Sequence, residues 1–382
     1  MKWNKEKTSY LLCALLVAFA LLAPALIETQ VRRDRYAEWV QPTTPVWQGQ
    51  LSLWAVVGFP VGQNTLGGWV RERVRAFEKD AFGVYVDVRV MSSEEAKAAL
   101  DAGETPDVIV FPAGFFDSPD RLLPIDAPEG LNGALADSAK EGGTAYALPV
   151  MAGAYVLAVN EELGMAAGVT PPEDIGYSPA QIAAMAGAEG GSLCVDQSEY
   201  SNPAFAFAYA LTEGEEAAVQ ALEKAKDSGT FYSGNGLLCL GNQNTAATAR
   251  SNYENGEGFN STVWALSGFT DMVEYVGVVS GRTGAKAEIC AQLAGCFLSE
   301  EAQQSVKDLG MFPALRGEPL YEDDGRYWAA EQAFAQNTAA PPCFGYAAVR
   351  VRWAKWLEEA AKGDAGALQA LLEDMRAACK QG

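Results

Sequence analysis

Apolar runs alternate with amphipathic stretches from about residue 50 onward. Residues 51–57 are almost continuously apolar, which predicts a buried strand. Residues 65–80 repeat apolar side chains at helical spacing, and residues 84–90 alternate valine with tyrosine, aspartate and arginine, which predicts a strand with one wet face near a sheet edge. A capped helix that ends at Gly103 and a buried strand, "PDVIVFP", follow. This order of elements predicts a parallel sheet covered by helices on both faces.

The stretch "GGTAYALPVMAGAYVLAVN", residues 142–160, contains two further apolar runs. Pro149 has no backbone N–H to donate to a sheet, so it is predicted to mark the break between two strands. Asn160 is expected to end the second strand, with its side chain satisfying backbone groups nearby. Farther along, residues 284–298 predict a helix, and a second helix is expected to begin at Ser299.

The first 30 residues resemble a targeting or membrane segment. Three lysines precede residues 10–27, an uncharged apolar stretch whose length suits a membrane span or a long signal-peptide core. An uncleaved anchor is favoured over a cleaved signal, and a buried helix of a cytosolic protein is the third alternative. Residues 31–49 predict a polar linker, so that the remaining chain is expected outside the cytoplasm, anchored to the cell membrane or secreted.

Composition removes several classes of function. The formal net charge is −21, so nucleic acid is not an expected partner. The chain has no histidine, which excludes Ser-His-Asp and Cys-His catalysis and histidine-ligated zinc. No nucleotide-binding glycine motif and no calcium loop is present, so neither a cofactor nor a metal is expected. Cys194 and Cys239 both lie in short apolar runs, and the sequence leaves open whether they form a disulfide or remain free thiols.

Aromatic residues are abundant, with 9 Trp, 14 Tyr and 16 Phe. Ligands of open α/β sheets bind beyond the carboxyl ends of the strands, where aromatic faces beside amides and carboxylates suit a sugar ring. Each aromatic taken singly is more often a core residue, but as a set their placement favours a cleft. The aromatic candidates are Trp54, Phe111, Phe116, Phe205, Trp264 and Tyr346.

An ordered set of seven pieces resembles the extracellular solute-binding proteins of bacterial ABC transporters, in the branch of maltose- and oligosaccharide-binding receptors. These pieces span roughly residues 50–360. They read "LSLWAVV", "VRAFEKDAFGVYVDV", "AGETPDVIVFPAGFF", "LPID", "GGTAYALPVMAGAYVLAVNEEL", "FLSEEAQQSVKDLGMFPAL" and "FGYAAVRVRWAKW".

The resemblance implies a type 2 periplasmic-binding-protein fold, in which two discontinuous α/β lobes enclose a ligand cleft, here preceded by one hydrophobic helix. It implies lobe 1 as residues 50–155 plus 265–311 and lobe 2 as residues 156–264 plus 312–382. Closure would be a hinge motion, for which the predicted hinge residues are Pro149, Asn160 and Pro313. By similarity, Phe111, Phe205, Trp264 and Tyr346 fall near sugar-stacking positions, and Asn64 begins a helix whose N–H groups are expected to meet a ligand oxygen.

The resemblance also implies a function. The expected activity is that of a receptor, not an enzyme, which delivers a small polar ligand to the permease subunits of an ABC transporter. Sugar is the favoured ligand, whereas a cation such as a polyamine would suit Asp117, Asp271 or Glu274 together with tryptophans. Two alternatives remain: a membrane-anchored ligand sensor without transport, and a glycoside hydrolase that uses two carboxylates.

Overall fold

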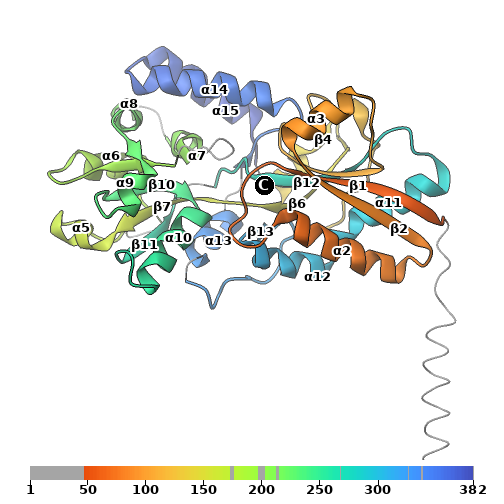
Figure 1. The fold of residues 1–382 in the computed structure, drawn as a ribbon. Helices are drawn as coiled ribbons and strands as arrows, with labels where there is room; N and C mark the ends of the chain where they lie inside the picture. Colours follow the sequence, from red (N-terminus) through yellow and green to blue (C-terminus); the bar gives the residue numbers. More distant parts are fainter. Residues whose placement is uncertain are drawn as a thin grey trace, which may run out of the picture.

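The computed structural model describes residues 47–172, 176–196, 203–211, 215–266, 268–325, 327–336 and 339–381. The predicted membrane anchor and most of the predicted linker lie outside these residues. Within them, no helix combines the length and the apolar character needed to cross a membrane. The described chain forms two α/β lobes, each built on its own sheet (Figure 1).

The first lobe is built on a six-stranded sheet in the order β13-β6-β12-β3-β1-β2. As the alternating pattern predicts, β1 pairs in parallel with both β2 and β3, whereas β12 runs antiparallel to β3 and β6. The strands are β1 (Gly49–Val57), β2 (Val84–Ser92), β3 (Val108–Pro112), β6 (Leu148–Ala152), β12 (Val273–Val278) and β13 (Phe312–Pro313). Around them lie α2 (Leu66–Asp80), α3 (Ser93–Asp101), η1 (Pro119–Arg121), α4 (Gly133–Ser138), the hairpin β4 (Lys140–Glu141) and β5 (Thr144–Ala145), α11 (Gly284–Cys296), α12 (Glu300–Gln304) and η3 (Ser305–Leu309).

The second lobe contains a five-stranded sheet in the order β11-β7-β10-β8-β9. Its strands are β7 (Tyr155–Asn160), β8 (Leu193–Val195), β9 (Lys226–Asp227), β10 (Leu238–Asn242) and β11 (Ser261–Ala265). Its helices are α5 (Glu161–Ala166), α6 (Pro179–Gly187), α7 (Pro203–Tyr209), α8 (Glu216–Val219), η2 (Gln220–Leu222), α9 (Ser228–Tyr232) and α10 (Gln243–Glu254). The chain ends with α13 (Trp328–Gln336), β14 (Ala339–Ala340), α14 (Tyr346–Ala361), α15 (Ala365–Ala378) and β15 (Lys380–Gln381). The long helix α14 packs against α7 and α8, so it belongs with this lobe (Figure 1).

One strand of the first sheet falls outside the lobe that the resemblance assigns to it. β13, at Phe312–Pro313, pairs with β6 and extends the first sheet, although residues 312–382 were assigned to the second lobe. Pro313 therefore lies on an edge strand, where a missing N–H is tolerated.

Local capping signals place the first helices as expected. The side chain of Thr65 accepts a hydrogen bond from the Gly68 N–H and begins α2. Ser92 and Glu95 form a reciprocal capping box at the start of α3. The apolar face of α2 is buried on the sheet through Leu66, Trp69, Val70, Val74 and Phe77.

The strand break near residue 150 lies elsewhere than predicted. β6 runs through Pro149, and the chain turns at Gly153 and Ala154 before β7. The ladder between β6 and β12 shifts register beside Pro149, so the proline sits where regular pairing is already interrupted. The prediction that Pro149 separates the two strands is wrong.

Asn160 ends β7 as predicted, but it does not lie at the junction of the lobes. Its Oδ1 atom accepts hydrogen bonds from the N–H groups of Glu162 and Leu163 and so caps α5. It lies five residues beyond Tyr155, roughly 17 Å farther into the second lobe at strand rise. The role that the structure shows for Asn160 is therefore that of a helix cap.

A cluster of charges joins the strands of the first sheet at the start of β3, opposite the carboxyl end that faces α14. The carboxylate of Asp107 lies 2.8 Å from Arg282 and 2.8 Å from Lys286, and it accepts the Ser52 N–H at 3.0 Å. Burial raises the pKa of Asp107, but hydrogen bonds from Lys286, the Ser52 backbone and Arg282 outweigh burial and lower it. The cluster ties the start of β3 to β1 and to the loop after β12.

The cysteines of the described residues are free thiols. Cys194 and Cys239 are register neighbours on β8 and β10 but form no disulfide. Burial raises the pKa of both thiols, which disfavours the reactive thiolate. The sequence left open whether these two cysteines form a disulfide, and in this structure they are buried free thiols.

Candidate ligand-binding site

A pocket of about 250 Å³ lies between the lobes at the carboxyl ends of β1 and β3. The first lobe contributes the residues that follow these two strands and one face of α3, and the second lobe contributes the first turns of α14. Asp271, on the segment that joins β11 to β12, completes the wall. The lining residues are Gly58, Phe59, Ser93, Lys97, Pro112, Ala113, Gly114, Phe115, Asp271, Tyr346, Ala347, Arg350 and Val351.

Two glycines allow the backbone to close around this pocket. At Gly58, just after β1, a Cβ atom would lie 2.1 Å from the Cβ of Pro112, which is too close for any side chain. Gly114 has a φ of +77°, and a Cβ there would lie 2.8 Å from the backbone nitrogen of Ala347. Gly114 thus brings the loop after β3 into contact with the start of α14, which joins the two walls.

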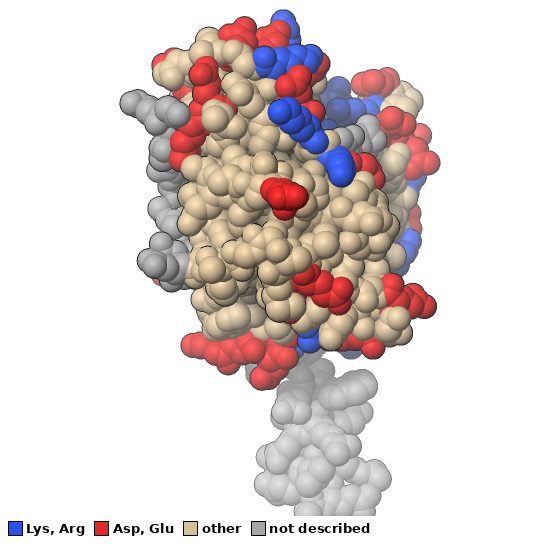
Figure 2. All heavy atoms as spheres, turned by 90° about the vertical axis from the view of Figure 1, so that its left-hand side faces the viewer, with Lys and Arg blue, Asp and Glu red and all other residues tan. Residues whose placement is uncertain are grey.

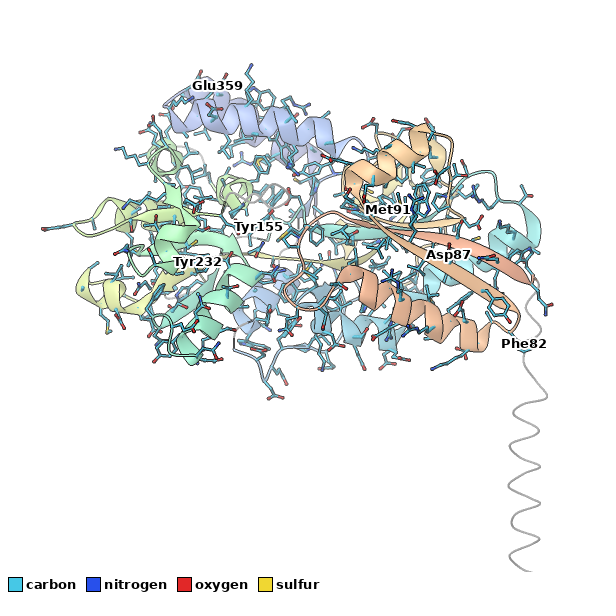
Figure 3. The ribbon with its side chains drawn as sticks, viewed as in Figure 1. Phe82, Asp87, Met91, Tyr155, Tyr232 and Glu359 are labelled. Atoms are coloured by element: carbon cyan, nitrogen blue, oxygen red, sulfur yellow. The ribbon has the colours of Figure 1, made fainter. Side chains whose placement is uncertain are left out.

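Three buried side chains connect the pocket to the crossing strand. Asp271 accepts a hydrogen bond from the Tyr155 hydroxyl at 2.5 Å and another from the Tyr346 hydroxyl at 2.6 Å. Tyr155 opens β7 near the middle of the molecule (Figure 3), and Tyr346 opens α14. The Tyr155–Asp271–Tyr346 cluster therefore links the pocket wall to the strand that carries the chain into the second lobe.

Burial dominates the acid-base properties of this region. It raises the pKa of Asp271, although the two tyrosine hydroxyls and the charge of Arg350 oppose the rise. Glu274, on β12, is fully buried, and neither of its carboxyl oxygens forms a hydrogen bond within the described chain. Burial raises the pKa of Glu274 well above its ordinary value, against the lowering effect of the Gly58 N–H. Neither carboxyl group presents an accessible charge to a ligand.

The lobes also touch through the start of α10. The Asn244 side chain donates to the carbonyl oxygen of Pro60 at 3.2 Å, across the gap between the lobes. The buried side chain of Gln243 accepts a hydrogen bond from the N–H of Ala154 at 2.9 Å, in the turn between β6 and β7. Both contacts hold α10 close to the loop after β1 and to the crossing turn.

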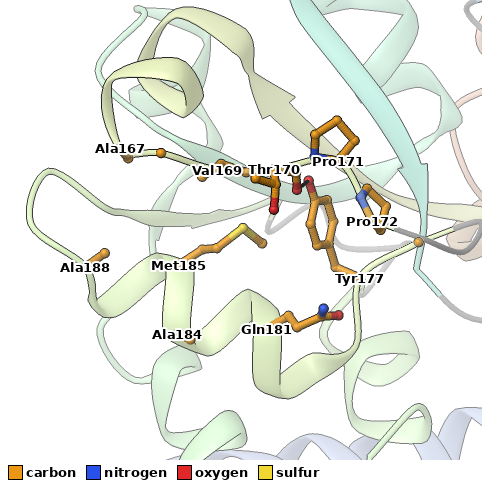
Figure 4. Close-up of a pocket in the computed structure, with 12 residues that line it drawn as sticks. Ala167, Val169, Thr170, Pro171, Pro172, Tyr177, Gln181, Ala184, Met185 and Ala188 are labelled. Atoms are coloured by element: carbon orange, nitrogen blue, oxygen red, sulfur yellow. Dashed lines mark hydrogen bonds between the residues drawn. The ribbon is translucent and has the colours of Figure 1, made fainter.

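A larger hollow of about 710 Å³ lies within the second lobe, between the loop after α5 and helix α6 (Figure 4). Tyr177 crosses it, and its hydroxyl donates to the Thr170 carbonyl at 2.8 Å. Its lining includes Val169, Pro171 and Met185, and it is separate from the carboxyl ends of β1 and β3. The smaller interlobe pocket is therefore the better candidate site, since it is lined by both lobes.

The predicted ligand-binding residues separate into two groups. Five aromatic rings are core residues that expose almost no surface: Trp54, Phe111, Phe116, Phe205 and Tyr346. Of these, Tyr346 lines the interlobe pocket, whereas Phe111 packs against Phe116 and Tyr275 inside the first lobe. Phe205 is fully buried and meets Trp353 edge to face. As placed here, the other four rings do not line the interlobe pocket, and the core covers them.

The remaining three predicted residues are at least partly accessible. Asn64 is exposed, and its side chain donates to the Asp308 carbonyl at 2.7 Å. Asp117 is exposed just beyond the loop after β3. Trp264 is half-buried on β11, where its ring meets Tyr177 at 5.8 Å. None of the three lines the interlobe pocket.

Sequence reasoning did not select Phe59, Lys97, Gly114 or Arg350. Phe59 and Gly114 follow β1 and β3 directly, so the rule that sites lie beyond strand ends was sufficient to find them. Lys97 and Arg350 carry no such signal, because in sequence each looks like an ordinary solvated helix residue. Only the packing of α14 against the first lobe brings them to one pocket. Within the described residues, no group of three or more cysteine, aspartate or glutamate side chains forms a metal site.

The face of the second lobe in Figure 2 shows how the acidic charge is distributed. Asp and Glu side chains lie along its lower edge, near the top and singly close to the centre, and basic side chains lie mainly near the top among acidic ones. Most of the area between is uncharged, so this face carries no continuous basic patch of the kind that binds a phosphate backbone.

No protein-family model and no curated protein matches the chain in sequence. Solved structures are nevertheless similar to it. They include the cyclic α-maltosyl-1,6-maltose binding protein from Arthrobacter globiformis, with a TM-score of 0.62, 15% identity and coverage of 87% of this chain and 99% of that chain.

Two further similar structures come from other bacteria. The maltose-maltodextrin binding protein of Alicyclobacillus acidocaldarius has a TM-score of 0.56 at 16% identity, covering 86% of this chain and 100% of that one. A sugar transporter protein from Rhizobium etli in an open conformation has a TM-score of 0.60 at 15% identity, covering 86% and 99%. The chain therefore has the two-lobed α/β fold of the type 2 periplasmic binding proteins.

Proposed function

We propose that this protein is an extracytoplasmic receptor that binds a sugar or oligosaccharide between its two lobes and delivers it to an ABC permease, with its N-terminal segment holding it at the membrane. The observation that carries the proposal is the interlobe pocket, lined by strand ends of one lobe and by α14 of the other. The similar structures of the same fold bear the names of sugar-binding and maltodextrin-binding proteins.

The buried carboxyl groups support binding over hydrolysis. A glycoside hydrolase needs two accessible carboxylates on either side of the scissile bond. The acidic residue of the lining is Asp271, which is held by two tyrosine hydroxyls, and Glu274 on β12 is fully buried. Asn64, Asp117 and Trp264 stay candidates for ligand contacts that form when the lobes move relative to one another.

A thermal-shift screen of the purified full-length protein against mono- and oligosaccharides, polyamines and amino acids tests the proposal. A ligand at about 100 times its dissociation constant stabilises the folded state by roughly 2.7 kcal/mol. We expect sugars to raise the melting temperature and polyamines to leave it unchanged. If sugars produce no shift, the proposal is refuted.

A steric variant tests the location of the site. Ala347 is exposed on the first turn of α14 and lines the pocket, so Ala347→Trp is expected to fill the pocket and abolish the shift. The neighbouring Ala348 is also exposed but lies outside the lining, so Ala348→Trp is the matched control. Equal binding by both variants would place the ligand elsewhere.

A further inference from the structure

The two most exposed aromatic side chains of the described residues lie at one end of the first lobe. Phe82 is 67% exposed and Tyr85 is 68% exposed, whereas the next aromatic residue in this order, Tyr253, is 42% exposed. Figure 3 shows Phe82 at the end of the first lobe that points away from the second lobe. Tyr85 follows Phe82 by three residues, so both rings meet water at the same tip of the molecule.

The local structure explains why neither ring is a core side chain. Phe82 lies in the turn between α2 and β2, and Gly83 continues this turn with a φ of +86°. Val84 is 1% exposed, and because side chains alternate along a strand, Tyr85 points to the opposite face of the sheet. Its register neighbour on β1 is Gln50, which is exposed as well.

The chain enters the fold at the same tip. Trp47 is the first described residue, and the Gly49 N–H two positions later donates to the Gly83 carbonyl at 3.0 Å. The amino end of β1 therefore lies beside the turn that carries Phe82. The residues before Trp47 include the predicted membrane segment, residues 10–27. This tip is thus the part of the described fold that lies closest to that segment along the chain.

The charged side chains near the tip are few and of both signs. Lys79 and Asp80, in the last turn of α2, are exposed, as is Asp87 on β2. The carboxylate of Glu78 accepts the Val86 N–H at 2.8 Å. The net charge of −21 is therefore not concentrated at this tip. Exposed aromatic rings with little net charge around them suit the interface of a neutral phospholipid bilayer.

We infer that Phe82 and Tyr85 form a docking surface for the phospholipid bilayer, with both rings inserted at the level of the headgroups. The inference rests on the proposed function, because residues 10–27 must hold the protein at a membrane, and it deepens that function by stating which end of the protein meets the lipid. Exposed apolar patches mark sites of membrane contact, and aromatic rings favour the interface. Tethering raises the effective concentration of lipid at the tip, so two rings are sufficient for contact.

This contact leaves the ligand site open. The docking tip lies at the amino end of β1, whereas the interlobe pocket lies at the carboxyl end of the same strand. The nine residues of β1 separate the two ends by roughly 30 Å at strand rise. Because the contact involves the first lobe alone, lobe closure would move the second lobe while the first keeps its orientation on the membrane.

Photo-crosslinking of the full-length protein, reconstituted into phosphatidylcholine vesicles, tests the inference. The variants Phe82→p-benzoylphenylalanine and Tyr85→p-benzoylphenylalanine place a photoreactive group at each position. Met165→p-benzoylphenylalanine is the matched control, since Met165 is 75% exposed on α5 in the second lobe. We expect lipid adducts, identified by mass spectrometry, at positions 82 and 85 and their loss at position 165.

A second measurement separates the rings from the tether. Gln50→p-benzoylphenylalanine reports lipid beside Tyr85 without altering either ring. We expect the double variant Phe82→Ser/Tyr85→Ser to lower the lipid adducts at position 50, with the melting temperature unchanged because both side chains are exposed. Salt at about 1 M, which screens charges beyond roughly 3 Å, should leave the adducts of the parent protein unchanged, because rings and not charges make the contact.

The outcomes separate this inference from the proposed function. Lipid adducts as frequent at position 165 as at position 82 would overturn the inference, and so would adducts at position 50 that survive the double substitution. A cross-linked dimer in place of lipid adducts would assign the rings to a contact between two copies of the chain and would also overturn it. If the full-length protein does not float with the vesicles, the proposed membrane anchor and the inference fall together, whereas the sugar-dependent thermal shift tests the receptor separately.

Discussion

Removal of the Tyr346 hydroxyl tests whether the Tyr155–Asp271–Tyr346 cluster holds the two lobes together. In Tyr346→Phe the ring keeps its edge-to-face contact with Trp353, at 5.7 Å, while the 2.6 Å hydrogen bond to Asp271 is lost. Tyr346 is 2% exposed and Asp271 is 6% exposed, so water has little access to replace the missing donor. The change therefore isolates one buried hydrogen bond.

The expected loss follows from the nature of that bond. A hydrogen bond to a charged group contributes roughly 1.5–3 kcal/mol, and burial of both partners favours the upper half of this range. A loss of about 2 kcal/mol corresponds to a melting temperature lower by roughly 3 °C, because a chain of this size has an unfolding entropy of about 0.7 kcal/mol/K. Urea denaturation followed by tryptophan fluorescence measures the loss, with Tyr85→Phe, whose residue is 68% exposed, as the control.

The pH dependence of the loss gives a second, independent readout. Burial raises the pKa of Asp271 and the tyrosine hydroxyls oppose the rise, so the variant is expected to have a still higher pKa. A group with a raised pKa in the folded state contributes its full stability below its unfolded pKa, about 3.9 for aspartate, and loses it as the pH rises through the folded value. The deficit of Tyr346→Phe should therefore grow from pH 4 to pH 7.

A double-mutant cycle with Tyr155→Phe completes the test. Each single variant leaves Asp271 one tyrosine donor, whereas the double variant removes both, so the combined loss is expected to exceed the sum of the single losses. A deficit below about 0.5 kcal/mol, the same at pH 4 and pH 7, would refute the reasoning.

Three further perturbations probe other parts of the structure. Gly114→Ala is expected to destabilise the protein by roughly 1–3 kcal/mol in thermal denaturation, because it combines a positive φ with a close contact to Ala347, and Gly103→Ala is the matched control with a positive φ but open space. Equal losses in these two variants would contradict the contact. Asp107→Asn is expected to cost about 2–3 kcal/mol at pH 7, measured by urea denaturation, because it leaves Arg282 and Lys286 beside a neutral group. Since the pKa of Asp107 is lowered, this stability is present above the unfolded pKa and lost as the pH falls through the folded value, so a loss that is as large in acid as at pH 7 would argue against the ion pairs. Glu274→Gln is expected to match the wild type in acid and to become the more stable protein as the pH rises, because burial raises the pKa of Glu274. A constant difference across the pH range would show that the pKa of Glu274 is not raised in the folded state.

Local sequence patterns were sufficient to predict the first third of the fold. The spacing of apolar residues in residues 51–112 predicts the strands β1 to β3 and the helices α2 and α3, because burial on a sheet or helix face imposes its own period on the chain. The capping residues Thr65 and Ser92 act over a single turn, so their signals are readable without tertiary information.

The residues at which the chain crosses from one lobe to the other could not be predicted in the same way. Pro149 looks like a strand breaker when only its missing N–H is considered, yet it lies inside β6 because the partner strand β12 shifts register beside it. Whether a proline interrupts a sheet depends on the hydrogen-bond partner opposite it, and that partner is more than 100 residues away in the sequence. The same limit applies to Asn160. Its capping role depends only on neighbouring residues, whereas its distance from the crossing between the lobes depends on the tertiary structure.

The sequence by itself determined the α/β class, the division of the chain into alternating elements and the absence of histidine chemistry. Only the tertiary structure decided which aromatic residues are core and which polar residues share a site. Phe111 and Phe205 were predicted as ligand contacts, but Phe111 lies within β3 and Phe205 within α7, and long-range packing buries both completely. Lys97 and Arg350 are about 250 residues apart, and the docking of α14 against the first lobe alone makes them neighbours of one pocket. The physical reason is that burial and electrostatic environment are properties of contacts between distant segments, whereas a sequence pattern reports a residue's own strand or helix.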